Sequence, residues 1–395
     1  MNRSRPAFAA SLLLNLIALA SASAREVPLS ELPSDKLALM APLLRHGEVA
    51  LIESKSNGQM KQVTIMALVA APPDVLRQVV TTPEKWPEFI PGLTRSNVAH
   101  HPDGSLDYDF AMDLKFTTLS TNNRMVPRPD GAIYVWDNNP NDETTMRWQF
   151  IGVAGGTVMV QYGYSDVLHA NKWIQRVVKA APLMEHGLAV AGQFAYVRAM
   201  KARAEKLAKP GSFAVADPKA AGPGFKFLLE RGRVAVIRST PAGRLADISI
   251  LDSFMAAESK VEEVLLKPSE YSKFIDGVKK SYEVKRDGAA IVYETEFDLS
   301  ILTFSTRWEM RKNGNAVEAY AISGDRRGAH YRWDLTTRGA KETTVVYRSN
   351  EDLASASPLI LGSVFRTVPS FEHGIAVALG LVNVVGVRGR AEGKR

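Results

Sequence analysis

The chain of 395 residues contains no cysteine. This absence excludes disulfide bonds, thiolate metal sites and a cysteine nucleophile. The sequence also lacks a block of consecutive lysines and arginines, so its formal net charge of +7 does not indicate nucleic-acid binding. It has no P-loop, no dinucleotide glycine fingerprint, no HExxH and no G-x-S-x-G. Stability must come from a hydrophobic core, which a chain of this length can build.

The N-terminus has the pattern of a secretory signal peptide. Arg3 and Arg5 precede an apolar stretch from about Ala7 to Ala20, and small residues follow at 22–24. We therefore expect cleavage after Ala24 and a periplasmic or secreted protein. The alternative is an uncleaved N-terminal anchor.

The two halves of the chain repeat one another at an offset of 185 residues, which indicates a duplicated domain. The first matching segments are LLRHGEVALIES at 43–54 with LLERGRVAVIRS at 228–239, and PEKWPEFIPG at 83–92 with PSEYSKFIDG at 268–277. We align Tyr162 with Tyr347, after which the offset grows by two. PLMEHGLAVAG at 182–192 then matches PSFEHGIAVAL at 369–379.

Composition sets the expected domain boundaries. After the signal peptide at 1–24 we expect an N-terminal extension at 25–42 and a first domain at 43–208. A segment rich in proline, glycine and alanine at 209–227 reads as a linker. The second domain is expected at 228–393.

Alternating polarity predicts antiparallel strands in each copy. Tyr108, Phe110 and Met112 alternate with polar or small residues, as do Tyr293 and Phe297 in the second copy. Six further strands are predicted near 132–137, 145–151, 156–164, 316–322, 329–336 and 342–349. The polar outer positions predict a curved sheet covered on one side only. A long helix is expected to close each copy, from about Pro182 to Leu207 and from about Pro369 to Gly389.

This order of elements, with AAPPDVLRQVVTTPEKWPEFIPGLTRSNV at 70–98 and MKARAEKL at 200–207, resembles the START-like helix-grip superfamily. That superfamily includes lipid-transfer, coenzyme Q-binding and polyketide cyclase-like proteins. The resemblance implies an α+β fold with two tandem domains, each a curved antiparallel sheet wrapped around a long C-terminal helix. It also implies an apolar cavity between sheet and helix for a hydrophobic ligand. PSEYSKFIDG at 268–277 departs from the pattern because no proline follows its aromatic residue.

The inward positions of the predicted strands and long helices are the candidate ligand-binding residues. Large apolar side chains with a few polar groups are typical of ligand pockets, and the alternative for each is a place in the core. The candidates are Tyr108, Phe110, Met112, Thr121, Trp148, Phe150, His186, Phe194, Tyr293, Phe297, Thr306, Trp308, Trp333 and His373.

The repeated Glu-His-Gly opens both long helices. Adjacent helix residues project about 100° apart, so only one of each Glu-His pair can point inward. His186 shares a helix face with Val190 and Phe194, which predicts an inward histidine. Glutamate in a first helical turn is favoured by the helix dipole. The alternatives are an acid/base role for the histidines, ligand contact, or structural hydrogen bonds.

The sequence as a whole predicts an exported binding or transfer protein for a hydrophobic small molecule such as a lipid, sterol-like compound, quinone or isoprenoid. The alternative is a cyclase/aromatase-type enzyme with His186 and His373 as acid/base groups, and a third is a scaffold without a ligand. No cofactor, metal or nucleic acid is expected. Residues 374–387 carry no charge, which predicts that this helix packs on its own sheet and on the other domain, or docks on a membrane or partner.

Overall fold

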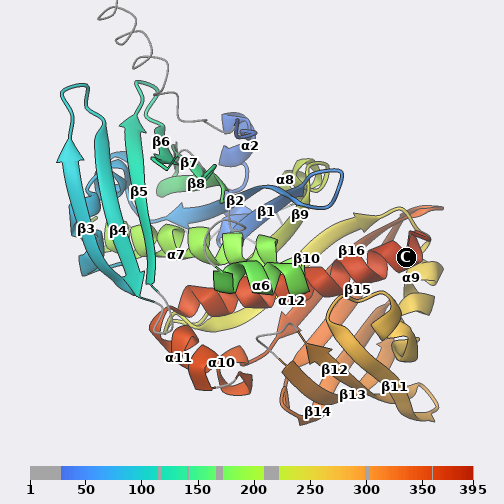
Figure 1. Ribbon diagram of the computed structural model, residues 1–395. Coiled ribbons are helices and arrows are strands. Elements are labelled where there is room, and N and C mark those ends of the chain that lie inside the picture. Colours follow the sequence, from blue (N-terminus) through green and yellow to red (C-terminus); the bar gives the residue numbers. More distant parts are fainter. Residues whose placement is uncertain are drawn as a thin grey trace, which may run out of the picture.

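The computed structural model describes residues 28–113, 118–139, 142–165, 172–208, 222–298, 303–357 and 359–394. The predicted signal peptide and most of the predicted linker lie outside these residues. Within the described part, the strands form one antiparallel sheet with two long helices across it (Figure 1). The α+β arrangement expected from the sequence is present.

The first copy opens with a hairpin of β1 (Glu48–Ser54) and β2 (Met60–Val69). Helix α4 (Pro73–Val80) follows, with proline at its start and Asp74 in its first turn, and leads into a short 3-10 segment, η1 (Pro83–Glu88). Six strands and two helices complete this copy: β3 (Leu93–His100), β4 (Leu106–Asp113), β5 (Thr118–Pro127), β6 (Ile133–Asp137), β7 (Thr145–Val153), β8 (Gly156–Tyr164), α6 (Lys172–Ala180) and α7 (Met184–Leu207).

The second copy repeats this order of elements. Its hairpin is β9 (Arg233–Ser239) with β10 (Leu245–Phe254), followed by α9 (Glu258–Leu265) and η3 (Pro268–Lys273). The remaining elements are β11 (Val278–Asp287), β12 (Ala290–Asp298), β13 (Thr303–Asn313), β14 (Ala316–Gly324), β15 (His330–Gly339), β16 (Glu342–Asn350), α10 (Leu353–Ala356), α11 (Leu359–Thr367) and α12 (Pro369–Ala391). The strands and long helices agree with the expected ranges to within a few residues, whereas α6, α10 and α11 were not foreseen.

The two copies share one sheet because β1 pairs with β9. The strand order is β11-β12-β13-β14-β15-β16-β10-β9-β1-β2-β8-β7-β6-β5-β4-β3. At the junction Ala50 lies opposite Ala235, which is its own counterpart at the repeat offset of 185. The pairing is therefore isologous, with a pseudo-two-fold axis between these two alanines, as in a symmetric dimer made from one chain.

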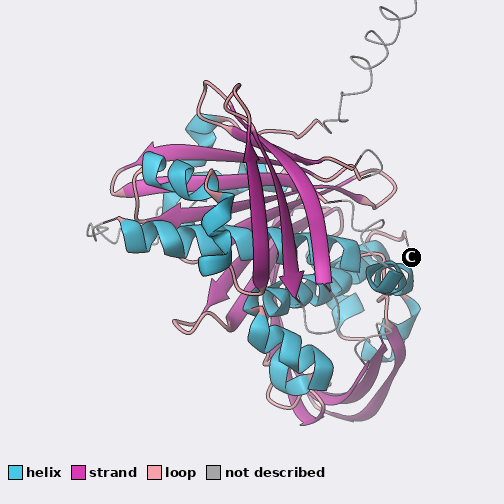
Figure 2. Ribbon diagram, turned by 60° about the vertical axis from the view of Figure 1, so that its left-hand side comes forward, coloured by secondary structure: helices cyan, strands magenta, loops and turns pink. Residues whose placement is uncertain are grey.

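The long helices α7 and α12 cross on the inner face of the sheet and run antiparallel (Figures 1 and 2). A Cβ added at Gly187 would lie 2.8 Å from the carbonyl oxygen of Gly374, and a Cβ added at Gly374 would lie 2.6 Å from that of Gly187. Ala378 and Ala191 complete the contact in the same reciprocal way. Small residues at four-residue spacing let the two helix backbones touch, so the helix crossing has the same pseudo-symmetry as the sheet.

The outer face at the junction is also covered, which corrects the expectation of a sheet covered on one side only. Helices α2 (Ser34–Ala38), α3 (Ala41–Leu44) and α8 (Gly222–Leu229) contribute Leu37, Leu44 and Leu228 to a second apolar cluster. This cluster covers β1, β2, β8 and β9 on the side opposite α7. Since α8 begins at residue 222, the end of the predicted linker is helical.

The strand register corrects the alignment of Tyr162 with Tyr347. Trp148 lies opposite Gln161, whereas its counterpart Trp333 lies opposite Tyr347. Tyr162 consequently points to the outer face, where its hydroxyl accepts from the backbone N–H of Leu32 at 3.2 Å. A shift of one residue in a strand reverses the face of every side chain, so one of the two inserted residues precedes β16.

Helix α12 is long and apolar enough, by length and composition, to span a membrane, and it is the one such helix in the described part of the chain. However, 83% of its apolar window is buried inside the protein. It contacts α7 of the other copy and, within its own copy, α9, α10, α11, β10 and β16, so its composition follows from its place in the core. The expectation that it packs on its own sheet and on the other copy is confirmed.

Candidate functional site

The interior of the first copy lies between its curved sheet and α7. Trp86, Tyr108, Phe110 and Tyr196 pack there edge to face or stacked, with ring centroids 5.2–6.3 Å apart. These four rings join the outer strands of this copy's sheet, here called the arm (β4 and β5), to α7. Trp86 is held in place because its indole N–H donates to the Val79 carbonyl at 3.2 Å. Tyr108 and Phe110, two of the predicted ligand residues, therefore lie in the interior.

Polar groups line the same interior. Gln193 of α7 donates to the Gly163 carbonyl at 3.3 Å, and Gln161 of β8 contacts the Met146 sulfur at 3.3 Å. Among the described residues, the carbonyl oxygens of both glutamines and the Tyr196 hydroxyl are buried and have no hydrogen-bond partner. Each such group costs roughly 1–3 kcal/mol while unpaired.

A further polar row crosses the sheet at the arm of the first copy. Tyr108 lies opposite Asn123, and Asn123 lies opposite Asp137. Burial raises the pKa of the Asp137 carboxyl, and the neighbouring Asp142 adds to the rise. The Asn123 side chain donates to the Thr121 hydroxyl at 2.5 Å, so Thr121, a predicted ligand residue, belongs to the same row.

The second copy fills the corresponding space with aromatic and paired groups. The Trp308 indole N–H donates to Thr295 at 3.0 Å, and the hydroxyls of Tyr293 and Tyr331 bond to each other. The Arg326 guanidinium lies over the Trp308 ring at 5.2 Å and pairs with the buried Glu351. Of the predicted residues here, only the Thr306 hydroxyl is buried without a partner within the described ranges.

One exchange of residues accounts for much of this difference. In the first copy the helix carries Gln193 and the strand carries Gly163, where an added Cβ would lie 2.6 Å from the Gln193 Nε2. In the second copy the helix carries Gly380 at the position of Gln193, and the strand carries Tyr347 where the first copy has Gln161; the Tyr347 ring would lie 3.1 Å from a Cβ at 380. The first copy therefore presents an amide where the second presents a packed ring.

The fourteen predicted ligand residues fall into three groups in the structure. Those of the first interior are Tyr108, Phe110, Met112, Thr121, Trp148 and Phe150, of which Thr121 and Phe150 are half-buried and the rest buried. Those of the second interior are Tyr293, Phe297, Thr306, Trp308 and Trp333, all buried. The third group, between the copies, is His186, Phe194 and His373. Gln161, Gln193 and Tyr196 were missed, although Gln193 is the one amide side chain of α7 and lies in its apolar first half.

Each predicted histidine contacts a serine on the first strand of its own copy. The His186 Nε2 lies 3.1 Å from the Ser54 hydroxyl, and the His373 Nε2 lies 2.9 Å from the equivalent Ser239 hydroxyl. His373 also packs against Phe194 of the other copy, with ring centroids 5.0 Å apart. Burial is the main cause that lowers the pKa of both histidines to about 4.

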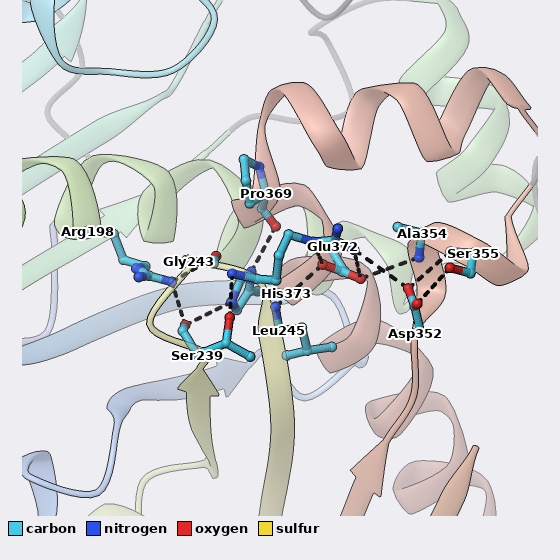
Figure 3. Close-up of polar contacts among 12 residues, drawn as sticks. Arg198, Ser239, Gly243, Leu245, Asp352, Ala354, Ser355, Pro369, Glu372 and His373 are labelled. Carbon is cyan, nitrogen blue, oxygen red and sulfur yellow. Dashed lines mark hydrogen bonds and ion pairs between the residues drawn. The ribbon is translucent and has the colours of Figure 1, made fainter. Parts of the chain in front are cut away.

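The glutamates of the repeated motif fix hairpins to the long helices. Glu372 accepts from the Nε and Nη2 of Arg244, each at 2.8 Å, and Glu185 accepts from the backbone N–H of Met60 at 3.2 Å. Leu245 stands in the β9–β10 hairpin where Met60 stands in the β1–β2 hairpin, and its backbone N–H also donates to Glu372, at 3.4 Å (Figure 3). Because these contacts are internal, both glutamates serve the packing of the fold.

Two surface grooves occur where the copies meet. One is lined by Ser54, Glu185 and Arg233, with a volume of about 560 Å³, and the other by Ser239 and Arg198, with a volume of about 510 Å³. Since the two serines are equivalent in the repeat, the grooves are related by the pseudo-two-fold axis. The described residues contain no cluster of three or more histidine, aspartate or glutamate side chains that could hold a metal ion.

Comparisons with known proteins find similarity in solved structures alone: no family model and no curated relative matches the chain. The di-domain aromatase/cyclase BexL from the BE-7585A biosynthetic pathway is 13% identical, covering 85% of this chain and 98% of its own, with a TM-score of 0.31. The di-domain aromatase/cyclase StfQ from the steffimycin pathway is 13% identical, covering 82% and 97%, with a TM-score of 0.29. The STAR-related lipid transfer protein from Xanthomonas axonopodis is 13% identical, covering 38% and 93%, with a TM-score of 0.28.

These solved structures belong to the START superfamily and to the di-domain aromatase/cyclases, the same group that the sequence pattern resembles. Such loose superpositions carry no argument about the activity of this chain. Its assignment as a tandem helix-grip protein rests on its own strand order and its two long helices.

Proposed function

We propose that the protein is an exported carrier that sequesters a hydrophobic small molecule in the interior of its first copy. The observation that supports this most is the set of buried, unpartnered polar atoms of Gln161, Gln193 and Tyr196 in an interior that is mainly apolar. Apolar walls bind a water-insoluble molecule through burial at ~25 cal/mol per Å², and a few polar groups fix its orientation.

The polar atoms also indicate the chemistry of the ligand. An amide oxygen accepts hydrogen bonds and cannot donate them, so the ligand carries a hydroxyl or amine group on a hydrophobic body. A sterol-like compound or an isoprenoid alcohol has this combination. We place the ligand between α7 and the strands β4 and β5, beside the packed rings of Phe110 and Tyr196.

The asymmetry between the copies supports one ligand per chain. In the second copy, Tyr347 and Trp308 fill space that their smaller counterparts, Gln161 and Asn123, leave open in the first copy. The second copy then serves as a partner that completes the sheet and buries α7. Export and transient contact with a membrane remain expectations from the sequence.

The test is organic extraction of the protein purified from a cell in which the signal peptide is processed, followed by mass spectrometry. We expect about one equivalent of a hydrophobic alcohol or amine per chain. Gln193→Leu removes one acceptor and should weaken retention about fivefold, which corresponds to one hydrogen bond of about 1 kcal/mol.

Thr306→Val is the matched control, because it removes the unpartnered hydroxyl of the second interior. We expect it to leave the extracted amount unchanged. Protein that yields no hydrophobic compound, and binds none from a total lipid extract, would contradict the carrier function. Loss of ligand in Thr306→Val rather than in Gln193→Leu would assign binding to the second copy.

The cyclase/aromatase alternative stays a prediction from the sequence. Its two acid/base candidates, His186 and His373, bond to Ser54 and Ser239 between the copies and lie apart from the polar row of Asn123 in the first interior. Incubation with a cyclisable polyketide tests it directly.

A further inference from the structure

The Ser239–His373 pair has a feature that the carrier function does not use. The His373 Nδ1 lies 2.8 Å from the Pro369 carbonyl oxygen, which only accepts hydrogen bonds (Figure 3). Nδ1 therefore carries the ring proton, and the neutral Nε2 presents its lone pair to the Ser239 hydroxyl at 2.9 Å. The backbone thus holds the histidine in the tautomer that a general base requires.

Arg198 determines the direction of the serine proton. A guanidinium nitrogen of Arg198, which comes from α7 of the other copy, donates to the Ser239 oxygen. The same nitrogen donates to the Gly243 carbonyl at 3.2 Å, which fixes its position (Figure 3). Because Ser239 accepts from Arg198, its own proton points to His373, and the positive charge favours a negative charge on the serine oxygen.

The equivalent pair in the first copy lacks both features. Within the described chain, the Nδ1 of His186 is buried and has no hydrogen-bond partner, so its tautomer is not fixed by a neighbour. Val385 occupies the position in α12 that Arg198 occupies in α7. Ser54 thus contacts a histidine that has no counterpart of the Pro369 carbonyl contact, and it has no counterpart of Arg198 beside it. The Ser54–His186 pair is therefore a natural control within the same molecule.

Ser239 is reachable from solvent. It is half-buried and lines the groove of about 510 Å³ together with Arg45, Arg198, Lys201 and Arg238. Lys201 pairs with Glu48 and Arg238 with Asp247. Arg45 and Arg198 form no ion pair with a carboxylate among the described residues, which leaves positive charge beside the serine for an anionic substrate.

We propose that Ser239 and His373 form a nucleophile and general base for hydrolysis of a small acyl ester that carries a negatively charged group. The Ser239 oxygen attacks the acyl carbon while its proton passes to the His373 Nε2. The bond to the alcohol breaks, and the departing oxygen takes that proton. Water then attacks the acyl carbon, gives a proton to Nε2, and the serine is released with its proton restored and a carboxylic acid as the second product.

The electrostatic surroundings keep the base neutral. Burial, and to a smaller extent Arg198 from α7, lower the pKa of His373, while the Pro369 carbonyl, Glu372 and Glu48 from β1 oppose the change; the resulting pKa is about 4. The imidazole is therefore neutral, with the Nε2 lone pair free, from mildly acidic to neutral pH. The nearby carboxylates of Glu372 and Glu48 stabilise the transient imidazolium.

The test uses the full mature chain with a fluorophosphonate probe, which reacts covalently with activated serines, and with the p-nitrophenyl monoester of succinic acid as an anionic substrate. Peptide mass spectrometry should locate the adduct on Ser239 and not on Ser54. Ser239→Ala should abolish both labelling and ester turnover, whereas Ser54→Ala should leave both unchanged. Arg198→Met should slow labelling by about tenfold or more, since it removes the charge beside the oxygen.

Circular dichroism and the unfolding midpoint establish that each variant is folded. The labelling rate of the unmodified protein should stay constant from about pH 8 to about pH 5.5, because the buried base is already neutral. Absence of an adduct on Ser239 in excess probe, turnover that persists in Ser239→Ala, or a rate that falls with a midpoint near pH 6.5 would each overturn the proposal.

Discussion

The two buried histidines should make the stability of this protein depend on pH in a range where most carboxylates do not titrate. Burial lowers the pKa of His186 and of His373 from 6.5 to about 4. The unfolded chain exposes both rings, so it takes up protons at higher pH than the folded chain does. The stability that the two neutral rings contribute is complete above about pH 6.5 and is lost as the pH falls toward about 4.

The magnitude follows from the two pKa values. At about pH 5 the unfolded imidazole is almost fully protonated and the folded one is almost fully neutral, which costs about 2 kcal/mol per histidine and about 4 kcal/mol for both. Urea unfolding at about pH 7.5 and about pH 5 measures this difference. The double variant His186→Gln with His373→Gln should lose most of the dependence, and each single variant about half.

His101 is the matched control, because it bonds to Asp107 at a partly exposed turn at 2.7 Å. His101→Gln should retain the full difference between the two pH values. If the double variant at His186 and His373 kept the wild-type difference, the two rings would not be the source of the effect. A broad, multiphasic transition would instead show that the copies unfold separately.

Three further outcomes follow from the packing. Gly374→Leu should lower the free energy of unfolding by about 2 kcal/mol or more, because its Cβ meets α7, whereas Gly192→Ala, where an added Cβ meets nothing within 4 Å, should be neutral or stabilising in thermal unfolding. Arg244→Met leaves the buried Glu372 carboxylate without its bidentate partner and should cost about 2 kcal/mol by urea unfolding, since Arg244 is itself one third exposed. Gln193→Leu should leave stability equal or higher while it weakens ligand retention; a large loss of stability would contradict an unsatisfied amide at this site.

The duplication and the order of elements were predictable because both depend on local pattern. The alternation around Tyr108 and Tyr293 requires strands, and the apolar residues from Pro369 onward require a buried helix. The repeat of Glu-His-Gly gave the correct correspondence of α7 and α12. The alignment of Tyr162 with Tyr347 failed because identity of residue type does not record an inserted residue, and one residue reverses the face of a strand.

The candidate site was predictable in outline and not in its polar details. Large inward residues such as Trp148 and Trp333 were found from alternation alone. Gln161 and Gln193 were missed because the role of an amide within an apolar segment depends on the residue that packs against it, and the sequence does not give that residue. The contrast between the helix residues Gln193 and Gly380 can be interpreted only with the strand residues that they contact, Gly163 and Tyr347.

The sequence by itself determined that this protein is a tandem pair of helix-grip units, because strand alternation, helix length and repetition are properties of neighbouring residues. The tertiary structure decided how the units combine. Strand pairing between β1 and β9 is made by backbone groups that every residue has, so no side-chain pattern specifies it in advance. That junction places Arg198 of one copy beside Ser239 and His373 of the other, and it gives the repeated motif two different environments.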